Sequence, residues 1–435
     1  MKISEFFNND YVDQASYDNL RKIASLVDGQ KNASRKVLYT LLEKNVKEKI
    51  KVSQLGSKVA EFAEYLHGNL DGVIVNLGQD FPGTNNIPLL QKKGNFGTRF
   101  SQEASASRYI YAYGTDQFFE LFKKDDTPIL KHQFFEGQQI EPMFYVPSLP
   151  ILLVNGSEGV SSGFAQKILP RNPESVKTYI TTKLSGGQPR IKLTPHYNGF
   201  KGIIEQGENS SQWLIKGVMK ITGINKVEIT EVPIGYDLKS YIDVLDKLED
   251  DKVIQGYKDK SENDNFLFEV TIPSKTLKEW SEEELMNKLK LIKKVSENYT
   301  VIDENNKIVV YESAEEIIDH YIRVKLNSLV NRKEYLKGRF EEEIRYDYSK
   351  YLFTKMIVEN KLIVAKRKKT DIVADLEKVS DILTRDDSYD YLLNMNILSL
   401  TEERMTKLES DIKQKKSDLD QLVKKTIEQI WTEEI

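Results

Sequence analysis

Apolar residues recur at a seven-residue spacing in the last third of the chain, at Ile322, Leu329 and Leu336. Such a repeat lines one stripe of a long helix with apolar side chains, and this stripe needs a second helix to cover it. A later segment has matching apolar residues at Met405, Leu408, Ile412, Leu419 and Leu422. Lys415 occupies the missing position of that second series. We therefore expect an antiparallel coiled coil, with a more globular helical piece around 346–400.

The chain has room for further domains, because it has 435 residues and single cores stop growing near ~250–300 residues. Hydrophobic residues make up 39% and charged residues 30%, a globular balance with the extra surface charge of long exposed helices. The sequence holds no cysteine, which excludes disulfides, cysteine zinc sites and a thiol nucleophile. Its four scattered histidines disfavour a histidine zinc site.

The chain has no apolar run near the ~20 residues that cross a bilayer. It begins with acidic residues where a signal peptide would be apolar. Together with the missing cysteine, these features favour a cytoplasmic protein without a membrane partner.

Positive charge is concentrated near the N-terminus, although the net charge is −4. Residues 21–58 hold ten basic and three acidic residues. This pattern suits either the solvated face of a helix or a module that binds phosphate groups.

The order of local patterns predicts a multidomain α+β protein. Residues 15–66 read as short helices, with Ser34 and Ser53 as candidate N-caps, and turn-rich material follows them. This combination suggests a helix-turn-helix or winged-helix module. Residues 144–164 read as a buried apolar strand that ends in a glycine loop, and 175–310 alternate short strands with helices.

Three tyrosines alternate at Tyr109, Tyr111 and Tyr113. Alternate residues of a strand point to one face, so the spacing alone favours a packed aromatic face and makes the three equivalent.

Common nucleotide-binding motifs are absent from the sequence, both the G-x-x-x-x-G-K-[ST] loop and the G-x-G-x-x-G loop. Asp418 and Asp420 form a D-x-D pair, but they flank Leu419 on a predicted helix, which favours a solvated face over a magnesium site. Metal or ATP chemistry would therefore come from another chain.

Six segments resemble, in order and spacing, motifs of the cleavage subunit of type IIA DNA topoisomerases. They are VDGQKNASRKVLY (27–39), YLHGNLDGVIVNLGQDFPGTNNIPLLQKKGNFGTR (65–99), ASASRYIY (104–111), LPILLVNGSEGVSSGF (149–164), TPHYNGFKG (194–202) and YDYLLNMNILSLTEERMTKLESDI (389–412). Within that family the chain is most similar to the medium subunit of T-even-type phage topoisomerases. The resemblance implies a winged-helix DNA-cleavage domain over 1–146, an α/β tower domain over 147–312, and a coiled coil with a helical dimerisation gate over 313–435.

The resemblance assigns the catalytic role to Tyr109, immediately after Arg108. A phenoxide can attack a DNA phosphorus and keep the 5′ end as a phosphotyrosine. A free tyrosine has a pKa of about 10, so the phenol needs activation, and a cation such as Arg108 favours the charged form. Tyr111 and Tyr113 would pack at the wall of the site.

The remaining roles follow from the same resemblance. Arg21 and His67 would act beside the nucleophile, and the further DNA-contacting residues would be Lys31, Arg35, Lys36, Gln79 and Val160. Val160 would wedge between base pairs where the family has an isoleucine. At three other positions the chain departs from the family, namely Leu66 for a second histidine, His196 for an aromatic residue and Asn198 for an arginine.

The resemblance also implies the assembly. Double-stranded DNA would be cleaved by a homodimer of this chain with a large partner subunit, which would hydrolyse ATP and bind most of the Mg²⁺. We expect relaxation and decatenation. One alternative is a non-catalytic DNA-bending protein with a dimerising coiled coil. A second, a tyrosine recombinase or relaxase, lacks its expected pattern of residues.

Overall fold

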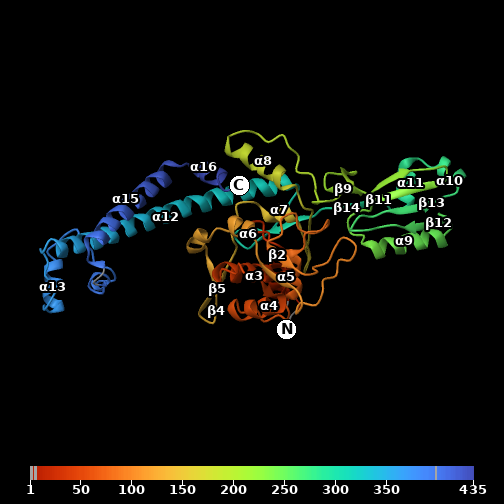
Figure 1. Cartoon of the computed structure of the whole chain (residues 1–435). Helices are drawn as coiled ribbons and strands as arrows, with labels where there is room; N and C mark the ends of the chain where they lie inside the picture. Colours follow the sequence, from red (N-terminus) through yellow and green to blue (C-terminus); the bar gives the residue numbers. More distant parts are fainter. Residues whose placement is uncertain (1–2, 4–6, 397–398) are drawn as a thin grey trace. The chain divides into compact units, whose positions relative to one another are not determined.

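The computed structural model describes residues 3, 7–396 and 399–435 (Figure 1). The chain divides into two compact units, Met1–Leu326 with Glu434–Ile435, and Asn327–Glu433. The boundary that we expected at 146/147 lies inside the first unit. The one expected at 312/313 lies just before helix α12 (Ala314–Val358), which contributes to both units. In the described part of the chain, no helix combines the length and apolar character needed to cross a bilayer.

The N-terminal part of the first unit is helical and carries a small sheet. Its elements are η1 (Phe7–Tyr11, a π-helix), α2 (Val12–Lys22), α3 (Asn32–Glu43), β1 (Ile50–Lys51), α4 (Val52–Phe62), α5 (Asp71–Gly78), β2 (Leu90–Lys93) and β3 (Tyr111–Gly114). The three strands form an antiparallel sheet in the order β1-β3-β2. A winged-helix module remains our prediction for these helices and their three-stranded antiparallel sheet.

Helix α3 is buried on all sides over residues 35–42, with Val37, Leu38, Leu41 and Leu42 among its apolar core residues. The helix begins earlier than we predicted, because Ser34 is its third residue and not its N-cap. The Ser34 hydroxyl bonds back to the backbone of Lys31, which is the N-cap. Ser53 is likewise the second residue of α4, whose N-cap is Lys51.

The segment 144–164 is not the single buried strand that we predicted. Residues 151–154 are buried in a short helix, and a hairpin follows. A short apolar run does not distinguish a buried strand from a buried helix, which explains the error. The elements of this middle region are α6 (Asp116–Leu121), η2 (Lys124–Ile129, a 3₁₀ helix), β4 (His132–Phe135), β5 (Gln138–Pro142), α7 (Ile151–Asn155), β6 (Ser157–Val160), β7 (Ala165–Ile168) and α8 (Pro173–Leu184).

The region 203–311 has the predicted alternation of strands and helices. One sheet has the order β14-β9-β8 and another the order β10-β11-β13-β12, and β15 pairs with β16. Helices α9 and α11 cover the four-stranded sheet, burying Tyr241 and Leu285 against Phe268. The elements are β8 (Ile203–Gln206), β9 (Gln212–Lys216), β10 (Val218–Ile221), β11 (Lys226–Glu231), α9 (Leu238–Asp250), β12 (Gly256–Asp259), β13 (Phe268–Thr271), α10 (Ser274–Glu279), α11 (Glu282–Lys288), β14 (Ile292–Ser296), β15 (Tyr299–Ile302) and β16 (Ile308–Tyr311).

In the second unit, helix α15 (Glu402–Lys424) lies antiparallel to α12 (Figure 1). Lys415 binds Glu343 and Asp347, each at 2.8 Å, and Lys333 donates to the backbone oxygen of Val423 at 3.1 Å. The lysine that interrupts the apolar series thus bridges the two helices. A coiled coil remains our prediction for this pair.

A separate apolar core, with Phe353, Ile372 and Leu376 at its centre, lies near the far end of α12. It agrees with the globular helical piece expected around 346–400. Its helices are α13 (Lys369–Leu376) and α14 (Asp390–Leu393), and α16 (Ile427–Thr432) follows α15. In the motif segment 389–412, residues 397–398 lie outside the described ones.

Candidate active site

Tyr109 lies on an exposed turn over residues 107–109, and 66% of its surface is accessible. The guanidinium carbon of Arg108 is 4.8 Å from the centre of the Tyr109 ring. This contact holds a positive charge beside the phenol, where it would stabilise a developing phenoxide. The structure therefore brings together the two residues predicted to carry out the reaction.

Tyr111 and Tyr113 lie on strand β3 and are half-buried. Tyr111 pairs with Lys51 on one side and with Lys93 on the other. The strand begins only at Tyr111, so the three tyrosines do not form one strand face as their spacing suggested. The strand boundary separates an exposed phenol from two packed ones.

Backbone bonds from helix α4 hold the tyrosine turn. The amides of Val52 and Ser53 donate to the backbone oxygens of Ile110 (3.0 Å) and Ser107 (3.4 Å). Ile110 is buried and anchors the residue next to Tyr109. The turn is therefore mounted on the first residues of a helix, with the Arg108 and Tyr109 side chains exposed and Ser107 half-buried.

Gln79 fixes the loop that precedes the turn. Its side-chain amide donates to the backbone oxygens of Phe96 at 2.8 Å and Gln102 at 3.4 Å. Gly97 has φ +91°, and a Cβ there would lie 2.5 Å from the Gln102 oxygen, so the close approach requires glycine. Gln79 acts here on protein backbone, which suits a supporting role.

His67 is exposed and bonds to a residue that the sequence did not single out. Its Nε2 lies 2.5 Å from the hydroxyl of Tyr17 on helix α2. The guanidinium carbon of Arg21, one turn further along α2, is 5.5 Å from the Tyr17 ring centre. Tyr17 therefore joins two predicted site residues, and only the spacing of Tyr17 and Arg21 on one helix face could have suggested it.

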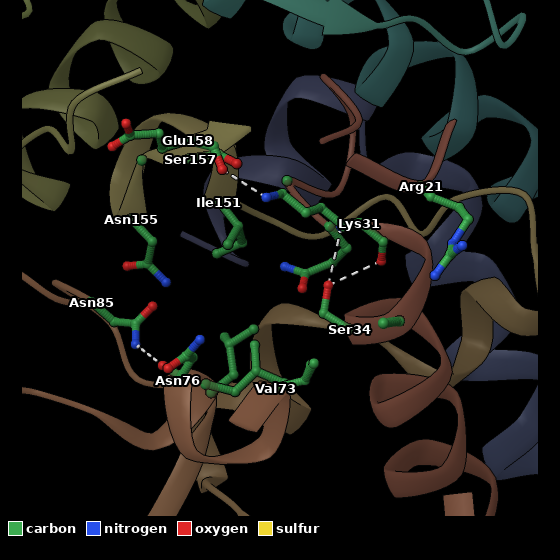
Figure 2. A pocket seen from close by; sticks show the side chains of 16 residues that line it. Arg21, Lys31, Ser34, Val73, Asn76, Asn85, Ile151, Asn155, Ser157 and Glu158 are labelled. Atoms are coloured by element: carbon green, nitrogen blue, oxygen red, sulfur yellow. Dashed lines mark hydrogen bonds between the residues drawn. The ribbon is translucent and has the colours of Figure 1, made fainter. Parts of the chain in front are cut away.

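Arg21 and Lys31 line one cavity of about 410 Å³ (Figure 2). The Lys31 ammonium donates to the backbone oxygen of Glu158 at 2.6 Å. Burial lowers the pKa of Lys31, and the negative charge of Glu158 opposes this shift. Asparagines 76, 85 and 155 add polar groups to the wall. Tyr109 is not among the residues that line this cavity, since it lies on the turn over residues 107–109.

Arg35 and Lys36 are buried, contrary to the expectation that they hold DNA phosphates. The Arg35 guanidinium pairs with Asp28, at 2.7 Å from Nε to Oδ2. The Lys36 ammonium lies 2.8 Å from a carboxylate oxygen of Glu141. Both cations neutralise buried carboxylates, and removing either one would leave an uncompensated buried charge.

Val160 is 73% exposed at the end of strand β6, where it pairs with Ala165 in the β6–β7 hairpin. An exposed apolar tip suits a wedge better than a core position does.

The Asn86 side chain holds the loop that contains His196 and Asn198. Its amide nitrogen donates to the backbone oxygens of His196, Val154 and Arg171, and its oxygen accepts a hydrogen bond from the backbone amide of Asn198. These two residues stabilise a loop in the structure.

The residues that the structure describes contain no group of three or more His, Asp or Glu side chains that could hold a metal ion. Asp418 accepts a hydrogen bond from Gln414 on the same helix at 2.8 Å, and Asp420 is exposed. These residues do not fit a resident magnesium site.

Comparisons with known proteins support the family resemblance. Residues 21–435 match the DNA gyrase/topoisomerase IV A-subunit family. The solved structure of the Plasmodium falciparum topoisomerase II DNA-binding, cleavage and re-ligation domain superimposes with a TM-score of 0.91 at 33% identity. The match covers 99% of this chain and 63% of that one.

Two curated relatives show the same relationship. The mitochondrial DNA topoisomerase 2 of Dictyostelium discoideum is 32% identical over 444 residues, which cover 99% of this chain and 34% of that protein. DNA topoisomerase 2 of Saccharomyces cerevisiae is 30% identical over 491 residues, with 100% and 34% coverage. The chain thus spans about a third of the length of these relatives.

The relatives named above are eukaryotic, so the expected likeness to a phage medium subunit is not confirmed. The family match covers nearly the whole chain, including the Arg108–Tyr109 pair. The chain therefore belongs to the DNA gyrase/topoisomerase IV A-subunit family.

Proposed function

We propose that this chain is the DNA-cleaving and rejoining part of an ATP-dependent type II topoisomerase, with Tyr109 as its nucleophile. The observation that carries the proposal is the exposed Tyr109 phenol beside the Arg108 guanidinium, on a turn anchored to helix α4. Tyr111 and Tyr113 are half-buried in the adjoining sheet, which disfavours them as nucleophiles.

The chemistry is a transesterification. The Tyr109 phenol loses its proton, and its oxygen attacks a backbone phosphorus. The bond from phosphorus to the 3′ oxygen breaks, and that oxygen leaves with a proton as a 3′ hydroxyl. Arg108 would stabilise the charge that develops on the phosphate oxygens. The 5′-phosphotyrosine keeps the bond energy, so the 3′ hydroxyl can reseal the strand by the reverse attack.

Arg21, Lys31 and His67 would hold the DNA near the scissile phosphate. Arg21 and Lys31 line the same cavity, and Tyr17 connects His67 to the helix that bears Arg21. Arg35 and Lys36 are omitted from this set, because each is buried against a carboxylate.

Val160 would bend the duplex by entering between two base pairs. Its exposed side chain at the tip of the β6–β7 hairpin supports this role. Valine is shorter than isoleucine, so it would unstack the bases less deeply. Partial unstacking costs a few kcal/mol per step, which the contacts of a wrapped duplex offset.

The full enzyme would contain several chains. We propose two copies of this chain, one tyrosine per DNA strand, joined through the helical second unit. A partner subunit would hydrolyse ATP and hold Mg²⁺, as the family resemblance implies. Magnesium would stabilise charge on the reacting phosphate. The assembly would relax and decatenate DNA in the cytoplasm. If a phage encodes the chain, this would be the cytoplasm of the host cell.

The alternative is a DNA-bending protein without catalysis, which the exposed Val160 tip would also suit. The test mixes the full chain with a co-expressed partner that carries the ATPase and binds magnesium, together with Mg²⁺ and supercoiled DNA. The mixture is then denatured with detergent. Our proposal predicts chain attached covalently to 5′ DNA ends. Bent DNA without any attached chain would favour the alternative.

A further inference from the structure

The tip of the β6–β7 hairpin is bound to helix α2 by one carboxylate. Asp18 Oδ2 accepts hydrogen bonds from the Ser161 hydroxyl at 3.0 Å, the Ser162 amide at 3.1 Å and the Ser162 hydroxyl at 3.0 Å. Asp18 Oδ1 lies 2.9 Å from the Lys22 ammonium on the same helix. Both carboxylate oxygens are therefore occupied, and the three donors on one of them come from two adjacent residues of the hairpin.

The other side of Val160 is held as well. A Cβ at Gly159 would lie 2.1 Å from the backbone oxygen of Lys22, so strand β6 approaches the end of α2 as closely as only glycine allows. The Lys31 ammonium binds the backbone oxygen of Glu158. The residues before and after Val160 are thus both fixed to the helical module, while the Val160 side chain is exposed.

A wedge needs such a mount. Inserting an apolar side chain between base pairs costs a few kcal/mol of unstacking, and this free energy favours any displacement of the hairpin that lets the bases stack again. A hairpin tip held by its own turn alone would be displaced more easily. Hydrogen bonds to a charged acceptor are roughly twice as strong as neutral ones, so Asp18 is well suited to resist it.

The carboxylate is ionised under ordinary conditions. Hydrogen bonds from Lys22, Ser162 and Ser161 lower the pKa of Asp18 to about 2, against the opposing effect of burial. The Asp18 side chain is 18% exposed, and Lys22, Ser161 and Ser162 engage its two oxygens.

We propose that Asp18 is a positioning residue that clamps the Val160 hairpin to helix α2, so that the bending wedge and Arg21 engage the DNA as one rigid body. The proposal rests on the proposed function, since it assumes that Val160 bends DNA. Arg21 is three residues from Asp18 on the same helix. The clamp thereby links the place where the duplex is kinked to the cavity that Arg21 and Lys31 line.

The test measures bending by energy transfer between dyes on the two ends of a short duplex, bound to saturating full-length chain. We compare wild type with Asp18→Ala, with the pair Ser161→Ala/Ser162→Ala, and with Val160→Ala. The matched control is Asp13→Ala, because Asp13 is an exposed carboxylate on the same helix. A second duplex carries a gap at the kink position mapped with wild type, and it bends at little cost.

We expect Asp18→Ala to lower the ratio of bent to straight bound DNA about tenfold, and the serine pair to lower it less. Asp13→Ala should bend the duplex like wild type. All variants should bend the gapped duplex like wild type, which shows that they fold and bind. Should Asp18→Ala not fold, the serine pair decides, because it removes only two hydroxyl groups.

Two results would overturn the role of Val160 or that of Asp18. If Val160→Ala bends the intact duplex like wild type, the wedge itself is wrong, and the clamp has no purpose. If Val160→Ala reduces bending while Asp18→Ala and the serine pair do not, the wedge stands and the clamp is overturned.

Discussion

The hydroxyl of Tyr17 lies 2.5 Å from Nε2 of His67 and joins helix α2 to the loop after α4. The rings of Tyr65 and His67 meet edge to face, with their centres 6.1 Å apart. His67 is thus oriented from two sides, by the Tyr17 hydroxyl and by the Tyr65 ring. The Tyr17 hydroxyl therefore supports His67 in this structure.

Removing only the Tyr17 hydroxyl tests that relationship. We expect Tyr17→Phe to slow formation of the covalent DNA complex about fivefold, because one lost hydrogen bond is worth about 1 kcal/mol. DNA affinity should stay the same. Tyr65→Phe is the control, since it keeps the ring contact and the Tyr17–His67 bond. Equal rates for Tyr17→Phe and wild type would show that the bond does not support the reaction.

Arg35 and Arg21 should differ in what their loss costs. Arg35→Ala leaves Asp28 buried without its cation, so we expect about 3–5 kcal/mol of destabilisation in urea unfolding. Arg21→Ala should leave stability unchanged, weaken DNA binding and reduce its salt dependence by about one phosphate contact. If Arg35→Ala is as stable as wild type and fails to bind DNA, Arg35 is a DNA contact after all.

Asp18 gives a prediction about pH. The hydrogen bond from Lys22, assisted by those from Ser162 and Ser161, lowers the pKa of Asp18 from the usual 3.8 to about 2. A lowered pKa in the folded state means that the stabilisation is complete above 3.8 and is lost as the pH falls through 2. The hairpin contact should therefore not change with pH across the neutral range.

The titration of a labelled Asp18 carboxyl carbon, followed by NMR, checks this expectation. The midpoint should lie near 2 in wild type and should rise in Lys22→Ala, which removes the largest cause of the shift. A wild-type midpoint at the usual value would mean that the contacts of Asp18 with Lys22 and the hairpin do not form in solution.

Glu297 should be essential to the fold of the first unit. It pairs with the fully buried Arg171 at 2.7 Å and accepts a bond from the Trp213 ring nitrogen at 2.7 Å. Glu297→Ala should cost about 3–5 kcal/mol, because Arg171 would remain buried and unpaired. Glu208→Ala breaks the exposed pair with Lys294 and should change stability by less than about 0.5 kcal/mol. Similar losses for the two variants would contradict this reading.

The sequence predicted the order of helices and strands well, because apolar periodicity follows burial within one element. It also singled out the Arg108–Tyr109 pair, through its motif and not through spacing, and the catalytic role of this pair stays a prediction. It failed for Arg35 and Lys36, since a basic residue on a helix looks the same whether it faces DNA or a buried carboxylate. The partners Asp28 and Glu141 are set by tertiary packing.

Contacts between distant segments were also beyond sequence reasoning. Tyr17 and His67 are separated by 50 positions, and Asp18 and Ser162 by 144. Nothing in either segment marks these polar residues as partners. Helix α7 (Ile151–Asn155) was missed for a local reason, because its four apolar residues in a row suit a buried strand equally well.

The identity of the nucleophile is the central claim, and covalent trapping tests it most directly. Wild type, Tyr109→Phe, Tyr111→Phe and Tyr113→Phe would each be assembled with the ATPase and magnesium-binding partner. Each would be denatured during DNA cleavage and digested, so that mass spectrometry locates the nucleotide on a peptide. We predict that Tyr109→Phe alone abolishes attachment and that the wild-type adduct lies on Tyr109. Attachment that survives in Tyr109→Phe, or an adduct on Tyr111 or Tyr113, would contradict the account.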